Sequence, residues 1–519
     1  MKNRLVAILG LAAVLLSTPT GSQAEGANIQ AVLSAAPAYS SQADLRAFYE
    51  ARAFQPAWKD NDRKVAMAFL ANAASEGLAP DNYVPRQTAS AAYSDIALTR
   101  AVLLYAKDVR AGRLAANSVY DDVDLPPQPF DAGSMLEAAL NKGELKQFFS
   151  DLPPQQDGYA FLRTALAKYR QINAKGGWRP LRPMKGAVDD LQPGEQTELW
   201  ERLSAEDSGV QGNNSDVAGL DAALRRFQSR NGLEADGKIG PHTLKALNVT
   251  ASARVLQIEA NMERWRWLPH RLEPRYIMVN TADASLEAID NGKVVLVSRV
   301  VAGKPKTPTP IFAATIVAVT VNPPWNVPQS IASKEILPKL KRNPSYLAKE
   351  HMILRNGPAG DPRGLTINWA SISRSRFPFQ IQQLPGRTNA LGQLKLEMPN
   401  RFDVYMHDTP AKTLFTQNER FFSHGCVRVQ KVGALAKYAL TGNPQADVAR
   451  LIAGDDSTTD RLPLENPLKV YVLYWTAFQD ADGNIAFRDD IYDRDQRLIA
   501  ALSGQRVAEG PTPPIECNA

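Results

Sequence analysis

The chain has 519 residues, too many for one hydrophobic core, so we expect several domains. Hydrophobic residues make up 44% and charged residues 22%, which excludes global disorder and a protein built mainly of membrane spans. The formal net charge of +6 is compatible with an anionic polymer as partner, but equally with no polymeric partner. The sequence lacks the basic stripe interleaved with aromatic residues that would indicate nucleic-acid binding.

The N-terminus has the layout of a secretory signal peptide covering residues 1–24. Lys2 and Arg4 precede an apolar run from Leu5 to Leu16, and a small-x-small cleavage site ends at Ala24. The alternative is an uncut membrane anchor, although this run is short for a span of about 20 residues. We therefore expect an exported protein.

Residues 40–200 are expected to form a helical scaffold domain. Apolar side chains recur there at helical spacing, for example at Leu45, Phe48 and Tyr49. Proline clusters punctuate the segment, and no catalytic constellation appears in it.

Residues 216–250 follow a polar, glycine-rich break and predict two short helices. Leu220, Leu224 and Phe227 line one face of the first helix, and Gly240-Pro241 begins the second. The unit is either a helical spacer or a binding module. It resembles a peptidoglycan-binding helical module, and the matching positions are Leu224, Phe227-Gln228, Gly232-Leu233, Asp236-Gly237, Gly240 and Thr243.

Residues 274–478 predict a β-rich domain. Two β-rich runs flank a turn at residues 290–292, and further strands are expected within 311–321 and 469–478. The stretch 331–400 carries few strand signals and is expected to be a capping insertion. Residues 479–519 are expected to be a C-terminal tail, so the fold class is multidomain α+β.

Cys426 is the residue around which a catalytic site is predicted. It is one of two cysteines, and a disulfide with Cys517 is the structural alternative. A nucleophilic thiol needs a base and donors for an oxyanion, and His407 and His424 precede Cys426 in the chain. Gly425 permits close approach, so the amides around Gly425 and Cys426 are the expected oxyanion donors.

The pattern of His407, fifteen intervening residues and "SHGCVR" at 423–428 is similar to the signature of L,D-transpeptidases with a YkuD-type catalytic domain. Three further blocks resemble those of the large periplasmic class of this family, which also carries a helical scaffold and a peptidoglycan-binding module. These blocks are "NMERWRWLP" (261–269), "PTPIF" (308–312) and "NPPWNVPQSI" (322–331).

The resemblance implies roles for individual residues. Cys426 would be the nucleophile and His407 its base, while His424 and Gly425 would shape the oxyanion pocket. Arg428 would bind a substrate carboxylate or pair with an acidic residue of its own domain. The remaining candidates for the substrate site are Ser423, Tyr405 and Trp325, the last two as core or pocket wall, and Asp408, which would orient His407.

The resemblance further implies a periplasmic enzyme that forms 3→3 cross-links between tetrapeptide stems of peptidoglycan and releases D-Ala. Its expected partners are peptidoglycan stem peptides and other cell-wall synthases. The alternatives are an L,D-carboxypeptidase or endopeptidase, a transpeptidase that attaches a lipoprotein, and a non-catalytic wall-binding scaffold. No metal and no cofactor are expected, because His242, His270 and His351 lack metal-ligand spacing and no phosphate-binding glycine loop occurs.

Overall fold

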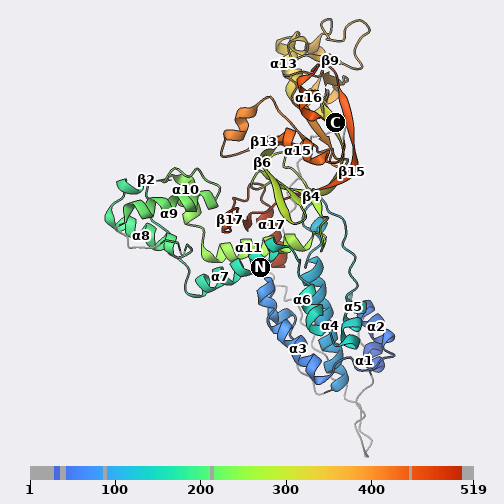
Figure 1. Cartoon of the computed structure of the whole chain (residues 1–519), viewed down its shortest axis with the longest axis vertical. Coiled ribbons are helices and arrows are strands. Elements are labelled where there is room, and N and C mark those ends of the chain that lie inside the picture. Colours follow the sequence, from blue (N-terminus) through green and yellow to red (C-terminus); the bar gives the residue numbers. More distant parts are fainter. Residues whose placement is uncertain are drawn as a thin grey trace, which may run out of the picture.

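The computed structural model describes residues 29–35, 42–85, 90–207, 209–210, 216–443 and 447–504. The N-terminal helices lie at one end of the molecule, the β-rich domain lies at the other, and a small helical module projects to one side (Figure 1). The expected signal peptide and Cys517 lie outside the described residues. Within those ranges, no helix is both long enough and apolar enough to span a bilayer.

In the described residues, the N-terminal scaffold is a bundle of six helices with its own core. The long central helix α4 is surrounded by the shorter ones, and its first turn is capped by Ser90, whose side chain accepts a hydrogen bond from the Tyr93 amide. The predicted helical character of this region is thereby confirmed. The helices are α1 (Ile29–Ala35), α2 (Gln42–Ala51), α3 (Asp60–Ala71), α4 (Ala91–Ala111), α5 (Ala132–Lys142) and α6 (Leu145–Asp151).

The small module has a separate core that begins earlier in the chain than expected. Leu181 and Leu199 pack with Leu224 and Phe227, so the expected boundaries at 200 and 216 divide one unit. The reason is physical, since two short helices cannot bury enough apolar surface without α8. The elements are β2 (Gly186–Ala187), α8 (Pro193–Ser204), α9 (Val217–Arg230), β3 (Lys238–Ile239) and α10 (Pro241–Leu247).

Two helices join the scaffold, the module and the β-rich domain. α7 (Asp157–Ala174) packs along α11 (Ala251–Arg266), and both contact the chain beyond residue 476. Residues 479–519 were expected to be a C-terminal tail. Up to residue 504 they are instead folded, because they form β17 (Ile485–Phe487) and α17 (Arg494–Leu502). Its buried anchor is Asp495, whose carboxylate accepts a hydrogen bond of 2.6 Å from Arg264 of α11.

The β-rich domain is a closed barrel, because β15 pairs with β4 on one side and with β7 on the other. The order around the barrel is β7, β11, β12, β14, β6, β5, β4 and β15. The barrel strands are β4 (Arg275–Asn280), β5 (Ser285–Asp290), β6 (Lys293–Gly303), β7 (Ile311–Val321), β11 (Leu394–Glu397), β12 (Met406–His407), β14 (Val427–Val429) and β15 (Asp460–Leu473).

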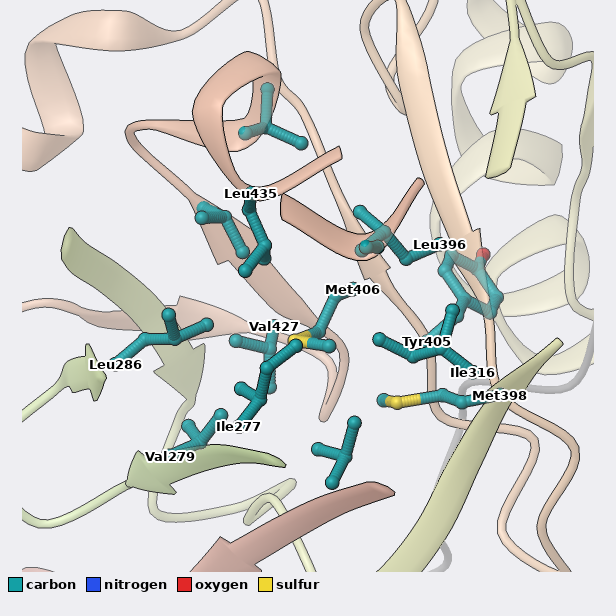
Figure 2. Packing of buried hydrophobic residues seen from close by; sticks show 14 of the residues in the cluster. Ile277, Val279, Leu286, Ile316, Leu396, Met398, Tyr405, Met406, Val427 and Leu435 are labelled. Atoms are coloured by element: carbon teal, nitrogen blue, oxygen red, sulfur yellow. The ribbon is translucent and has the colours of Figure 1, made fainter. Parts of the chain in front are cut away.

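Apolar side chains from all around the barrel fill its interior. Ile277, Leu286, Ile316, Leu396 and Met406 converge there (Figure 2). Helix α15 (Val432–Ala439) contributes to the same core and α16 (Val448–Ala453) lies beside it. Short strands extend the sheet at its margins, namely β1 (Val123–Asp124) beside β7 and β13 (Phe421–Ser423) beside β6, while β16 (Ala477–Gln479) pairs with β17.

The predicted hairpin turn is present between β5 and β6. Asn291 and Gly292 adopt positive φ of 47° and 76°, which Asn and Gly tolerate best. The segment expected as two β-rich runs contains three strands, since β4 and β5 are joined by a second tight turn.

The capping insertion differs from the expected range of 331–400 at both ends. It begins at β8 (Trp325–Asn326), and residues 394–397 already belong to the barrel as β11. The prediction missed these limits because the three cap strands are only two or three residues long. The cap contains α12 (Gln329–Ile331), a π-helical turn at Ala332–Ile336, α13 (Leu337–Arg342), α14 (Tyr346–Lys349), β9 (Met352–Leu354) and β10 (Ile381–Gln383).

Candidate active site

Two neighbouring parallel strands bring His407 and Cys426 to one place. In the pairing of β12 with β14, His407 is the register partner of Arg428 and Met406 that of Val427. The Val427 amide donates a hydrogen bond of 3.1 Å to the carbonyl of Tyr405, which fixes this register. Met406 and Val427 point into the barrel core (Figure 2), so the alternation of strand side chains places His407 and Arg428 on the outer face.

A pocket of about 200 Å³ opens between this outer face and the cap. The residues contributed by the barrel are Ala390, Leu391, Tyr405, His407, Ser423, His424, Cys426 and Arg428, and those contributed by the cap and its base are Trp325, Pro328, Ile331 and Glu335. Seven of the nine predicted site residues therefore line one cavity, whereas Gly425 and Asp408 do not.

Cys426 is a free thiol within the described part of the chain. The residue is only 7% exposed, so its sulfur is shielded from bulk solvent although it borders the pocket. The alternative of a disulfide concerns Cys517, which lies outside the described residues.

The turn that precedes Cys426 is held by side-chain hydroxyls. Gly425 has φ of 121°, a conformation that a residue with a Cβ rarely adopts. The Ser423 hydroxyl donates to the carbonyl of Cys426 at 2.6 Å and accepts from the Gly425 amide at 3.1 Å. The buried Thr309 hydroxyl donates to the carbonyl of Gly425 at 2.8 Å.

This geometry corrects the expected oxyanion donors. The Gly425 amide is already engaged by Ser423, so it does not point freely toward a substrate. Among the described residues, no acceptor is bonded to the amide of Cys426 itself. Of the two expected amides, the one on Cys426 is therefore the available donor, and Ser423 supports the turn instead of offering its hydroxyl to a ligand.

His407 is kept neutral by its surroundings. Burial lowers its pKa to about 3, and the positive charges of Arg428 and Lys395 contribute to this shift, while the backbone at Asp408 and Leu391 opposes it. Its Nδ1 is buried and makes no hydrogen bond of normal geometry in the described structure. A neutral imidazole has a free lone pair that can accept a proton, and a negative charge formed beside it would raise its affinity for that proton.

His424 lies at the boundary between barrel and cap. Its Nε2 is 2.7 Å from Oε1 of Glu335 in the π-helical turn and 3.3 Å from Nζ of Lys304. The side chain lines the pocket, but its ring nitrogen is directed toward the cap. His424 therefore joins the nucleophile turn to the cap, in addition to bordering the site.

The other predicted side chains have distinct positions. Tyr405 packs its ring against His407, with centroids 5.5 Å apart, and together with Trp325 it forms pocket wall, as expected. Arg428 borders the pocket, where it adds positive charge. Asp408 instead accepts hydrogen bonds from the Gln393 amide and from Lys412, so it does not orient His407 as expected.

Three functional candidates escaped the sequence reasoning as individual residues. Thr309 lies in the "PTPIF" block. The block was recognised by its resemblance to the family, but the sequence assigned no contact to Thr309 itself. Glu335 and Lys395 lie in segments without a recognisable motif, so only the folded structure brings Glu335 to His424 and Lys395 to His407. Within the described ranges, no group of three or more His, Cys, Asp or Glu side chains is arranged to hold a metal ion.

Comparisons with known proteins agree with this arrangement. Residues 274–448 match the family model YkuD, described as "L,D-transpeptidase catalytic domain". Residues 197–247 match a model described as "Putative peptidoglycan binding domain", and residues 43–166 match one described as "Scaffold domain".

One curated relative is the "Putative L,D-transpeptidase" of Haemophilus influenzae, 34% identical over 263 residues. The alignment covers 50% of this chain and 51% of the relative, so the chain spans about half the length of the protein it matches.

Solved structures of L,D-transpeptidases also align, at low similarity. A mutant enzyme from Enterococcus faecium is 14% identical with a TM-score of 0.18, covering 40% of this chain and 52% of that one. The enzyme from Xylanimonas cellulosilytica is 14% identical with a TM-score of 0.18, covering 57% and 100%. The family models confirm the resemblance: the chain carries a YkuD-type L,D-transpeptidase catalytic domain that follows a scaffold domain and a peptidoglycan-binding domain.

Proposed function

We propose that this chain is an exported L,D-transpeptidase that forms 3→3 cross-links in peptidoglycan through an acyl-enzyme on Cys426. The observation that carries the proposal is the convergence of Cys426 and the neutral His407 in one pocket between barrel and cap. A thiol, a base and a free amide donor are the minimum needed for acyl transfer through a thioester.

In the first half-reaction, Nε2 or Nδ1 of His407 takes the thiol proton and the sulfur of Cys426 attacks the carbonyl of the third residue of a tetrapeptide stem. The amide of Cys426 donates to the oxyanion that forms. The C–N bond to the terminal D-Ala then breaks, and the proton held by His407 passes to the departing amine. A thioester and free D-Ala result.

In the second half-reaction, a side-chain amine of another stem attacks the thioester. His407 accepts a proton from this amine, and the C–S bond breaks to return the thiol with that proton. The cap favours this outcome over hydrolysis, because Ile331 and Pro328 of the cap line the pocket with apolar surface and limit the access of water.

The proposal extends to location and partners. A cleaved signal peptide at residues 1–24 would deliver the protein to the periplasm, where stem peptides are available and where other cell-wall synthases act on the same polymer. The domain at 197–247, matched by a peptidoglycan-binding model, would hold the catalytic domain near its substrate.

The decisive test uses purified tetrapeptide muropeptides and mass spectrometry. Release of D-Ala together with cross-linked dimers is expected for the wild-type protein, and neither product for Cys426→Ala. Release of D-Ala without dimers would indicate that the protein is a carboxypeptidase and not a transpeptidase. No turnover by either protein would favour the non-catalytic scaffold or a lipoprotein as the missing acceptor.

An independent test examines the thiol without a stem peptide. A carbapenem should acylate Cys426, because ring opening of the β-lactam needs the same thiolate and oxyanion donor as the stem. Intact mass should show one adduct on the wild-type protein and none on Cys426→Ala. A wild-type protein that carries no adduct would contradict the proposed acyl-enzyme.

A further inference from the structure

The hydroxyl of Thr309 makes a hydrogen bond of defined direction to the nucleophile turn. It accepts a hydrogen bond of 2.9 Å from the Gly303 amide and lies 2.8 Å from the carbonyl oxygen of Gly425. A carbonyl oxygen can only accept, so the single proton of the hydroxyl is donated to Gly425. The loop before β7 therefore donates a hydrogen bond to the residue that precedes the nucleophile.

The position of Thr309 is fixed by its neighbours in the chain and in space. Pro308 and Pro310 flank it, and a residue that precedes a proline is restricted to extended backbone. Its side chain is fully buried, and its carbonyl accepts a hydrogen bond of 3.1 Å from Arg494. Thr309 is thus a rigid support for the Gly425 carbonyl.

The Gly425 carbonyl and the Cys426 amide belong to the same peptide unit. This unit is planar and trans, so its C=O and N–H bonds point in opposite directions. Thr309 is buried and does not line the pocket, whereas Cys426 does. By holding the carbonyl on the buried side, Thr309 directs the amide of Cys426 away from itself.

The other backbone groups of this turn are already engaged. The Ser423 hydroxyl accepts from the Gly425 amide at 3.1 Å and donates to the Cys426 carbonyl at 2.6 Å. The Cys426 amide is the one polar backbone group of Gly425 and Cys426 that has no partner in the described structure. A hydrogen bond to the carbonyl also polarises the peptide unit, which strengthens its N–H as a donor.

We propose that Thr309 is a positioning residue for the oxyanion donor. Its hydroxyl holds the peptide unit between Gly425 and Cys426 so that the Cys426 amide points at the oxyanion that forms during acylation. This inference rests on the proposed acyl-enzyme on Cys426. A donor that is held in place stabilises the transition state, because it needs no reorientation when the charge develops.

The test compares two reactions of Cys426 in the full-length protein, each followed by intact mass. Acylation by a carbapenem places negative charge on a carbonyl oxygen, whereas alkylation by iodoacetamide displaces iodide at a saturated carbon and needs only the thiolate. Thr309→Val keeps the shape of the side chain and removes the hydroxyl. Because outright removal of an oxyanion donor costs roughly 100- to 1000-fold, we expect roughly tenfold to 100-fold slower acylation and an unchanged rate of alkylation.

Two variants separate the hydrogen bond from packing and from stability. Thr309→Ser retains the hydroxyl and should be acylated at close to the wild-type rate. Thr281→Val removes another fully buried hydroxyl of the same domain, which donates to the carbonyl of Leu473 at 2.8 Å away from the pocket, and should leave both rates unchanged. If Thr309→Val fails to fold by circular dichroism, Thr309→Ala replaces it with the same expectation.

Equal rates of acylation for the wild-type protein and Thr309→Val would overturn the proposal. A parallel loss of acylation and alkylation in Thr309→Val would also overturn it, because the variant would then have displaced the thiol and not the amide. A serine variant as slow as the valine variant would exclude the hydroxyl as the active group. A wild-type protein that is alkylated but not acylated would instead refute the proposed acyl-enzyme.

Discussion

At the scale of single residues, the site depends on backbone conformations and charges that few substitutions preserve. Gly425 adopts positive φ immediately before the nucleophile, and its carbonyl and amide are both hydrogen-bonded. The direction of the Cys426 side chain is therefore set by its neighbours.

Gly425→Ala tests this dependence. A Cβ at φ of 121° costs about 1–3 kcal/mol of strain unless the turn relaxes, and relaxation displaces the Cys426 sulfur. We expect D-Ala release to fall roughly 100-fold, as for a misplacement of about 1 Å. Gly433→Ala is the control, because α15 has free space at that position and should tolerate the change. Equal losses in both variants would contradict the argument.

The lowered pKa of His407 predicts how the stability of the folded chain depends on pH. Its folded pKa of about 3 lies below the ordinary value of about 6.5, so between these values the unfolded chain binds a proton that the folded chain excludes. The contribution of neutral His407 to the free energy of unfolding is therefore fully present above about pH 6.5. This contribution decreases by up to about 1.4 kcal/mol per pH unit as the pH falls toward 3.

Thermal unfolding of the full chain at about pH 7 and about pH 4.5 measures this effect. His407→Gln should lose less stability on acidification than the wild-type protein, whereas the exposed His242→Gln should match the wild type. An identical loss in all three proteins would show that His407 is not the titrating group.

At the scale of elements, the contact between His424 and Glu335 couples the nucleophile turn to the cap. Glu335 belongs to a π-helical turn, a distortion often found at functional sites, and His424 precedes Cys426 by two residues. The contact is partly exposed, so its contribution is modest.

Glu335→Gln should loosen the cap and raise the ratio of hydrolysis to cross-linking. From the usual strength of such pairs, the expected change is about two- to fivefold. The ratio of free tripeptide to dimer gives the measurement, and Glu350→Gln in the same cap is the control, because Glu350 does not line the pocket. An unchanged ratio would mean that this contact does not govern the access of water.

At the scale of the whole molecule, distant parts of the chain meet behind the active site. Arg494 of α17 pairs with Asp122 of the scaffold and donates to the carbonyl of Thr309 at 3.1 Å. Thr309 in turn holds Gly425. The C-terminal segment and the scaffold therefore brace the loop on which the nucleophile turn rests.

Arg494→Gln should be strongly destabilising, because it leaves the carboxylate of Asp122 buried without its partner. Loss of one member of a buried pair costs about 3–5 kcal/mol, and the melting temperature and D-Ala release should fall together. Arg497→Gln on the same helix changes a half-buried side chain outside the pair and should have little effect. If Arg494→Gln had the melting temperature of the wild-type protein, the pair of Arg494 and Asp122 would not support the nucleophile turn.

The sequence by itself determined the domain types and the centre of the site. Helical and strand periodicities are local, and the "SHGC" block with its upstream His407 is a compact pattern, so both can be recognised from neighbouring residues. Short elements were harder, because β8, β9 and β10 contain too few residues for a period to emerge. The limits of the cap were therefore misplaced. The start of the small module was misplaced for another reason, because its core also needs α8, which was assigned to the scaffold.

Only the tertiary structure decided which groups surround Cys426. Lys395 beside His407, Glu335 beside His424 and Thr309 behind Gly425 come from separate segments, and their positions follow from strand register and from tertiary packing. The fold also assigned the Gly425 amide to Ser423 and turned Asp408 away from His407. Hydrogen bonding and electrostatics at a site depend on distances between side chains, and those distances are fixed only when remote parts of the chain pack together.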